Sequence, residues 1–164
     1  MHLRFAGIVT AACLYLAAIT ATAEPLTPLD AAGLRAELDA LQGRVVLVNF
    51  WATWCRSCLE EIPALMELET ELRENGFSLV AVSLDDPDSG DLLVRPFMNK
   101  WFPSFHSYLS VERDRDSMVS VVDPAWNEIL PTSYLLARDG SVAERIQGKN
   151  SAEEFTVKIL SLIK

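Results

Sequence analysis

Two cysteines, Cys55 and Cys58, have the residue type and the spacing that redox chemistry requires. They come directly after the apolar run "VVLVNF", and a pattern typical of an amphipathic helix begins with them. At the start of a helix, unpaired backbone N–H groups and the helix dipole stabilise a thiolate, which favours the ionised form of Cys55. Cys58 would lie one turn further in and be less exposed. The spacing therefore predicts that Cys55 attacks a partner disulfide and that Cys58 resolves the mixed disulfide.

The same two thiols also allow other interpretations. Structural zinc needs four Cys or His ligands, whereas the chain after residue 23 offers only these two cysteines and His106, which argues against zinc. Copper(I) binds two thiolates together with methionine sulfur, so a Cu(I)-binding chaperone is an alternative function. Three methionines are available to such a site: Met66, Met98 and Met118. A purely structural staple is disfavoured, because closing so short a loop removes little chain entropy.

The N-terminal 23 residues have the pattern of a secretory signal. Arg4 gives a short positive start, residues 5–19 are mostly apolar, and Ala21-Thr22-Ala23 has the small-x-small form of a cleavage site. We therefore expect a cleaved signal peptide over residues 1–23 and one domain over residues 24–164, with an uncleaved membrane anchor as the alternative. Cleavage would remove Cys13 and leave Cys55 and Cys58 as the only cysteines of the exported protein.

The charge of the chain argues against nucleic acid as a partner. The formal net charge at pH 7 is −9, and it becomes −10 when Arg4 is removed with the signal. Phosphate binding needs a basic surface, which such an acidic chain does not favour.

The elements that must position the cysteines follow from apolar periodicity and turn residues. We expect helices over residues 30–42, 55–75, 92–101 and 151–163, and strands over residues 45–50, 77–84, 104–109, 132–137 and 141–146. Asp139-Gly140 predicts a hairpin between the last two strands. Residues 25–28 are interpreted as an irregular lead-in, and residues 111–117 as a loop or helix start. This order predicts an α/β fold with a central mixed sheet and helices on both faces.

Two stretches resemble a known family. "VVLVNFWATWCRSCLEEIP" and, further on, "DPAWNEILPTSYLLARDGSV" are similar to the thioredoxin-like fold, and specifically to the TlpA/ResA-like exported thiol-disulfide oxidoreductases. The resemblance runs from about Gly43 to the C-terminus and includes Gly148 before the last helix. It implies that Cys55 is the nucleophile and Cys58 the resolving cysteine of a redox disulfide.

The resemblance also implies roles for residues around the cysteines. Trp54 would pack beside them, and Pro131 would be a cis-proline that faces the disulfide. The backbone of Leu130 would then pair with an extended segment of the substrate. Many thioredoxins have a buried aspartate at the position of Asn49, and asparagine cannot titrate, so another group must handle the proton of the resolving thiol.

Glu61 is the candidate for that proton. It holds the place of an active-site glutamate in ResA-like proteins, and an offset of three residues puts it on the same helix face as Cys58. We expect partial burial to raise its pKa enough for proton exchange with the thiols. The alternative is one more surface acid in a glutamate-rich helix.

The sequence thus predicts a periplasmic or otherwise exported thiol-disulfide oxidoreductase that reduces protein disulfides. The resemblance implies a membrane thiol transporter as electron donor, and apocytochrome c or metal-site cysteines as substrates. No metal and no organic cofactor are expected, and a monomer is expected. Arg56 and Ser57 between the cysteines leave the direction of electron flow open.

Overall fold

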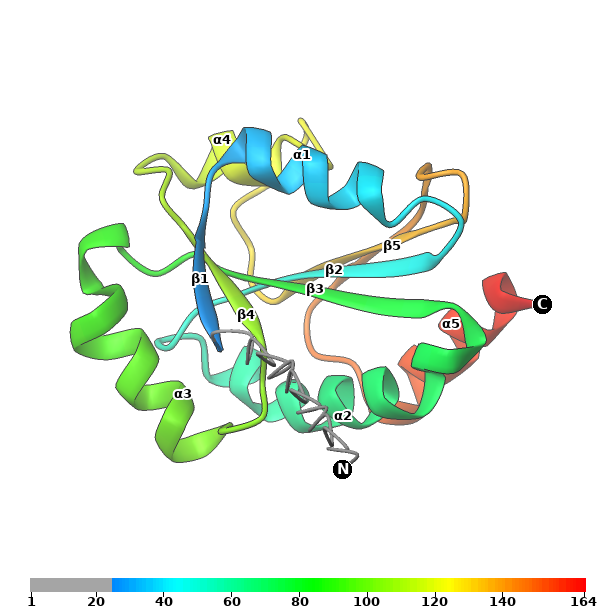
Figure 1. Cartoon of the computed structure of the whole chain (residues 1–164), viewed down its shortest axis with the longest axis horizontal. Helices are drawn as coiled ribbons and strands as arrows, with labels where there is room; N and C mark the ends of the chain where they lie inside the picture. The colour runs from blue at the N-terminus through cyan, green and yellow to red at the C-terminus, as the bar shows by residue number, and fades with distance from the viewer. Residues whose placement is uncertain (1–24) are drawn as a thin grey trace, which may run out of the picture.

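A six-stranded sheet forms the centre of the computed structural model, which describes residues 25–164 (Figure 1). The strands are β1 (Leu26–Leu29), β2 (Val45–Trp51), β3 (Phe77–Ser83), β4 (Ser107–Ser110), β5 (Thr132–Leu136) and β6 (Val142–Gln147). Their order in the sheet is β1-β4-β3-β2-β5-β6. The first four in this order pair in parallel, whereas β5 runs antiparallel to both β2 and β6. The predicted mixed sheet is therefore confirmed.

Helices cover both faces of the sheet, as expected. In Figure 1, α1 (Ala31–Ala40) and α4 (Arg115–Val119) lie on one face, and α2 (Arg56–Leu72), α3 (Arg95–Trp101) and α5 (Ala152–Ile163) lie on the other. Short 3-10 helices occupy Arg73–Asn75 and Pro87–Ser89, and a π-helical turn occupies Gly90–Val94. Separate apolar clusters fill the two sides, one around Leu34 and Tyr134 and two beneath α2 and α5.

Strand β2 carries the chain into the cysteines from the middle of the sheet. All seven of its residues are buried, and it pairs with β3 on one side and β5 on the other. A strand covered on both faces has no solvent-facing side, which explains why its sequence is continuously apolar except for Asn49.

Helix α2 begins directly after this strand. Cys55 is its N-cap residue, and the helix continues through Pro63 to Leu72. Ile62, Leu65 and Leu68 are buried against the sheet, as their spacing predicts. The start of the helix is therefore fixed at the end of the most buried strand.

Two sequence interpretations are corrected by the structure. Residues 25–28 are not only an irregular lead-in, because Leu26–Leu29 forms strand β1, which pairs with β4 at the edge of the sheet. Pro28 is compatible with this position because an edge strand can leave one side unpaired. The predicted helix over residues 92–101 starts with the π-helical turn before α3.

Residues 111–117 were expected to form a loop or the start of a helix. They contain the start of α4, which Asp114 caps.

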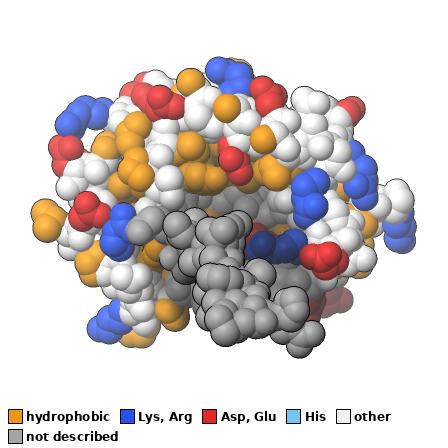
Figure 2. Space-filling view, in the orientation of Figure 1, with side chains coloured by type: hydrophobic (Ala, Val, Ile, Leu, Met, Phe, Trp, Pro, Cys, Tyr) orange, Lys and Arg blue, Asp and Glu red, His pale blue; other side chains and the backbone are white. Residues whose placement is uncertain are grey.

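The surface carries mixed charge. On the face shown in Figure 2, Lys and Arg side chains are scattered among acidic and apolar ones. Within residues 25–164, no helix is both long enough and apolar enough to cross a membrane.

Candidate active site

Cys55 and Cys58 are joined by a disulfide at the N-terminus of α2. The S–S distance is 2.03 Å and the two Cα atoms are 5.3 Å apart. The backbone N–H of Cys58 points at Sγ of Cys55, with an N-to-S distance of 3.3 Å. Cys55 is 7% exposed, whereas Cys58 has no exposed surface. The expected difference in exposure between the two cysteines is present.

An open pocket of about 420 Å³ lies beside Cys55 and not beside Cys58. Its lining combines residues of the α2 start with residues of the loop before β5: Trp54, Cys55, Arg56, Ser57, Glu60, Glu128 and Leu130. Trp54 is exposed, and the guanidinium of Arg115 lies over its ring at 5.4 Å. The pocket therefore offers an outside molecule access to the first cysteine.

The Leu130–Pro131 peptide bond is cis, as the resemblance implied. Strand β5 begins at the next residue, and the carbonyl of Pro131 accepts a hydrogen bond from the Gly148 N–H at 2.9 Å. The antiparallel pairing of β5 with β2 brings this segment to the end of the sheet where Cys55 lies. Leu130 and Cys55 thus line one pocket although they are far apart in the sequence.

Glu61 is buried one turn after Cys58 in α2, with 1% of its surface exposed. Its Oε1 accepts a hydrogen bond from Nδ2 of Asn49 at 3.0 Å, and its Oε2 accepts one from the backbone N–H of Asn150 at 3.4 Å. Burial raises the pKa of Glu61 from 4.5 to about 7, although these hydrogen bonds act in the opposite direction. Glu61 is therefore not a surface acid, and it titrates near neutral pH.

Asn49 connects Glu61 to the sheet. Its Nδ2 also donates to Oγ of Ser133 on β5 at 2.9 Å, and its Oδ1 has no hydrogen-bond partner within residues 25–164. The side-chain NH₂ of Asn49 therefore donates one hydrogen bond to Glu61 and one to Ser133.

Asp85 is a site residue that the sequence analysis missed. It is 4% exposed and accepts hydrogen bonds from the N–H of Thr53 at 2.9 Å, the Oγ1 of Thr53 at 2.6 Å and the Oγ of Ser83 at 2.7 Å. In the sequence it begins the acidic stretch "DDPDSGD", whose composition is typical of a solvent-exposed loop. Its position directly after β3 was the available signal, because the carboxyl ends of the parallel strands β2 and β3 meet. Asp85 holds the loop that leads into Cys55.

The charges at the mouth of the pocket are partly paired. The carboxylate of Glu60 forms ion pairs with Arg56 at 3.2 Å and with Lys149 at 2.7 Å. Arg56, which could have acted directly on the thiolate, thus has an acidic partner four residues away.

The methionines considered for copper divide between the two faces. Met98 and Met66 pack in the apolar cluster that contains both cysteines, whereas Met118 is buried in the cluster on the opposite face. Within the described residues, no group of three or more His, Cys, Asp or Glu side chains is arranged to hold a metal ion.

Comparison with known proteins decides the family. A sequence model of the AhpC/TSA family matches residues 18–145. The chain belongs to the AhpC/TSA family.

Relatives of this AhpC/TSA chain include the thiol-disulfide oxidoreductase ResA of two Bacillus species. The protein of Bacillus thuringiensis (strain Al Hakam) is 33% identical over 126 residues, which cover 77% of this chain and 68% of the relative. The protein of Bacillus subtilis is 30% identical over 135 residues, which cover 82% and 70%. The resemblance to ResA-like proteins is therefore confirmed.

Solved structures confirm the thioredoxin-like fold. A Chlorobium tepidum protein described as the thiol:disulfide interchange protein DsbE matches with a TM-score of 0.64 and 26% identity, covering 77% of this chain and 85% of that chain. StoA from Bacillus subtilis matches in fold with a TM-score of 0.55 and 24% identity, covering 71% and 82%.

Proposed function

We propose that this thiol-disulfide oxidoreductase reduces disulfides of other exported proteins, with Cys55 as nucleophile and Cys58 as resolving cysteine. The observation that carries the proposal is the asymmetry of the pair, in which only Cys55 lines the open pocket. In the reduced protein, the N–H of Cys58 and the dipole of the 17-residue helix α2 would stabilise a Cys55 thiolate.

The exchange would proceed in two steps. The Cys55 thiolate attacks one sulfur of the partner disulfide, which forms a mixed disulfide and expels the other partner sulfur as a thiolate. Cys58 then gives up its proton and attacks Sγ of Cys55. This step forms the Cys55–Cys58 bond and releases the second partner thiolate, so that two electrons have passed to the partner.

We infer that Glu61 accepts the proton that Cys58 loses in the second step. The carboxyl is buried one turn further along α2, and burial holds its pKa at about 7. A base of that pKa accepts a proton at neutral pH and gives it up again to solvent or to the released thiolate. This assignment keeps the charge of the exchange balanced, because the carboxylate becomes neutral as the partner gains its second thiolate.

The pocket would hold an extended segment of the partner. Trp54, next to Cys55, and Leu130, from the loop before β5, both line it. A segment that runs along Leu130 and Pro131 would add main-chain hydrogen bonds to the contact and bring its disulfide against Cys55. Trp54, Leu130 and Pro131 are therefore proposed as substrate-binding residues.

The proposal also covers the compartment in which the protein acts, its electron donor and its substrates. The signal predicted over residues 1–23, which lies outside the described residues, supports export to the periplasm or an equivalent compartment. A membrane-embedded thiol transporter would return Cys55 and Cys58 to the reduced state. Apocytochrome c and metal-site cysteines are the proposed substrate classes, and the protein would act as a monomer.

A trapping experiment tests the central claim. Cys58→Ser leaves Cys55 free to attack but unable to release the partner, so mixed disulfides should accumulate in the cell envelope and disappear on treatment with dithiothreitol. The double variant Cys55→Ser, Cys58→Ser is the matched control. Equal adducts in both variants, or none in Cys58→Ser while Cys55 reacts with a model disulfide in vitro, would contradict the proposal.

A further inference from the structure

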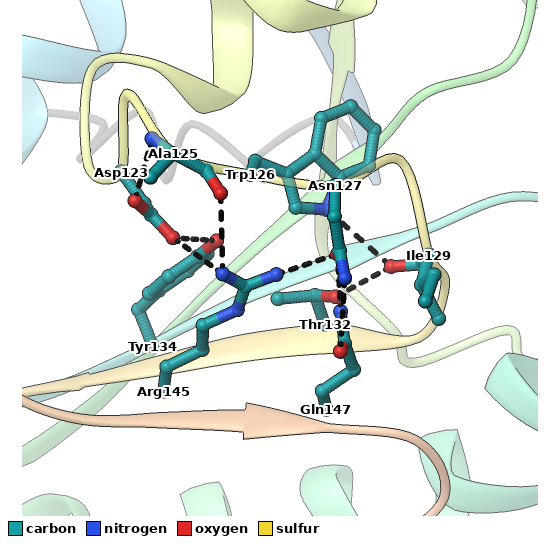
Figure 3. A network of polar contacts seen from close by, with 9 residues as sticks. All are labelled: Asp123, Ala125, Trp126, Asn127, Ile129, Thr132, Tyr134, Arg145 and Gln147. Atoms are coloured by element: carbon teal, nitrogen blue, oxygen red, sulfur yellow. Dashed lines mark hydrogen bonds and ion pairs between the residues drawn. The ribbon is translucent and has the colours of Figure 1, made fainter.

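Polar contacts join the loop between α4 and β5 to β6 (Figure 3). At its centre, Oδ1 of Asn127 accepts hydrogen bonds from Arg145 at 2.5 Å and from Gln147 at 2.6 Å, and Nδ2 of Asn127 returns one to Gln147 at 3.3 Å. Arg145 and Gln147 both belong to β6. The side chain of Asn127 is therefore tied to two neighbouring positions on one face of a strand.

The two ends of the loop are fixed as well. Arg145 also pairs with Asp123 at 3.2 Å, and Asp123 accepts a hydrogen bond from the hydroxyl of Tyr134 at 2.9 Å. Near the other end, the carbonyl of Ile129 accepts hydrogen bonds from Thr132 Oγ1 at 2.5 Å and from Trp126 Nε1 at 3.3 Å. Figure 3 shows these residues converging from the loop, β5 and β6.

Glu128 is presented by this fixed loop. It is the one residue other than glycine with a positive φ within residues 25–164, at 61°. This left-handed conformation costs free energy for a residue with a side chain and persists where the surroundings determine it. The side chain is exposed, lines the pocket beside Cys55, and makes no hydrogen bond or ion pair with another described residue. The fold therefore gains no hydrogen bond or ion pair from this side chain.

The other charges at the mouth are already engaged. Arg56 and Lys149 both pair with Glu60, and Arg115 donates to the carbonyl of Leu84 at 3.0 Å and lies over Trp54. Glu128 is thus the charged group of the pocket lining that is left for an incoming molecule.

We propose that Glu128 determines specificity by selecting partner segments with a Lys or Arg close to the reactive cysteine. This inference rests on the proposed function. Glu128 precedes Leu130 by two residues and lines the same pocket as Cys55, so a segment extended along Leu130 would bring a side chain about two residues from the attacked sulfur toward Glu128. An unpaired carboxylate beside the contact accelerates association with a basic partner and disfavours an acidic one. Asn127, held by Arg145 and Gln147, acts as a positioning residue.

Two disulfide-bridged peptides of identical sequence, except for Lys or Glu two residues from the reactive cysteine, test the proposal. The second-order rate constant for oxidation of the reduced protein should be about three- to ten-fold larger for the Lys peptide at low ionic strength, and the ratio should fall at 0.5 M salt. Glu128→Gln should bring the ratio close to one, and Glu128→Lys should invert it. Glu67→Gln is the matched control, because Glu67 is an exposed acid of α2 outside the pocket lining.

Positioning by Asn127 has its own measurement. Asn127→Ala should lower the Lys/Glu ratio while the reduction potential of the Cys55–Cys58 couple stays unchanged, which mere loss of stability would not produce. Equal ratios in wild type, Glu128→Gln and Glu67→Gln would overturn the inference while leaving the proposed function intact. If the reduced protein oxidises with neither peptide, the proposed function itself is wrong and the inference falls with it.

Discussion

Nδ2 of Asn49 on β2 donates a 3.0 Å hydrogen bond to Oε1 of Glu61 on α2, and both side chains are buried where the helix packs on the sheet. The bond favours the carboxylate, whereas burial favours the carboxylic acid, and burial is the stronger effect. The pKa of about 7 that results allows either form of Glu61 near neutral pH.

The first prediction concerns stability as a function of pH. In the unfolded chain Glu61 loses its proton near pH 4.5, whereas the folded protein keeps it until about pH 7. The unfolded state therefore binds fewer protons between these values, so this group lowers the free energy of unfolding as pH rises from 4.5 through 7. The full difference corresponds to about 3 kcal/mol, present below pH 4.5 and lost above pH 7.

Denaturant unfolding of the oxidised protein at pH 5 and pH 8 measures this effect. Glu61→Gln should lose less stability than wild type between the two pH values, whereas Glu67→Gln should follow wild type. Parallel losses in all three proteins would show that Glu61 has an ordinary pKa.

The second prediction concerns the exchange reaction. Without a carboxylate at position 61, Cys58 loses its proton acceptor, so Glu61→Gln should slow release of the mixed disulfide by about 10²-fold at pH 7. The first step, attack by Cys55, should change much less. Rapid-mixing experiments with a chromogenic mixed disulfide separate the two steps, and an unchanged release rate would remove Glu61 from the proposed mechanism.

The third prediction concerns the effect of Asn49 on the pKa of Glu61. Asn49→Ala removes a hydrogen bond that stabilises the ionised carboxylate, so the pKa of Glu61 should rise further, by about one. Carbon-13 NMR titration of the glutamate carboxyls gives the value directly. A lower pKa in this variant would mean that water entering the vacated space outweighs the lost hydrogen bond.

The fourth prediction concerns the loop before Cys55. Thr53→Val keeps the shape of the side chain but removes the 2.6 Å hydrogen bond to Asp85, which should cost about 1.5–3 kcal/mol of unfolding free energy because the acceptor is charged. Thr53→Ser keeps the hydroxyl and should lose much less. An unchanged free energy of unfolding in Thr53→Val would contradict the prediction.

The sequence predicted the elements that have strong local signals. Strand β2 is continuously apolar because both of its faces are covered, and the β5–β6 hairpin follows from Asp139-Gly140. Strand β1 was missed because four residues with an internal proline give almost no periodicity, and only pairing with β4 makes them a strand.

The sequence predicted those residues of the candidate site that lie close together in one helix or one motif. Cys55, Cys58 and Glu61 share a helix, so their spacing fixes their relation. Contacts between side chains from distant segments have no fixed spacing in the sequence. Examples are Asp85 with Thr53 and Asn127 with Arg145. Both depend on which strands become neighbours, and that information is spread along the whole chain.

The pairing of β2 with β5 has a consequence for folding order. Cys55 follows β2, but Leu130 comes just before β5, which pairs with β2 and follows β3 and β4 in the sequence. During synthesis the thiols therefore emerge long before the surface that receives a partner. Non-local pairing of this kind is completed late, so substrate selection can begin only when assembly of the sheet is finished.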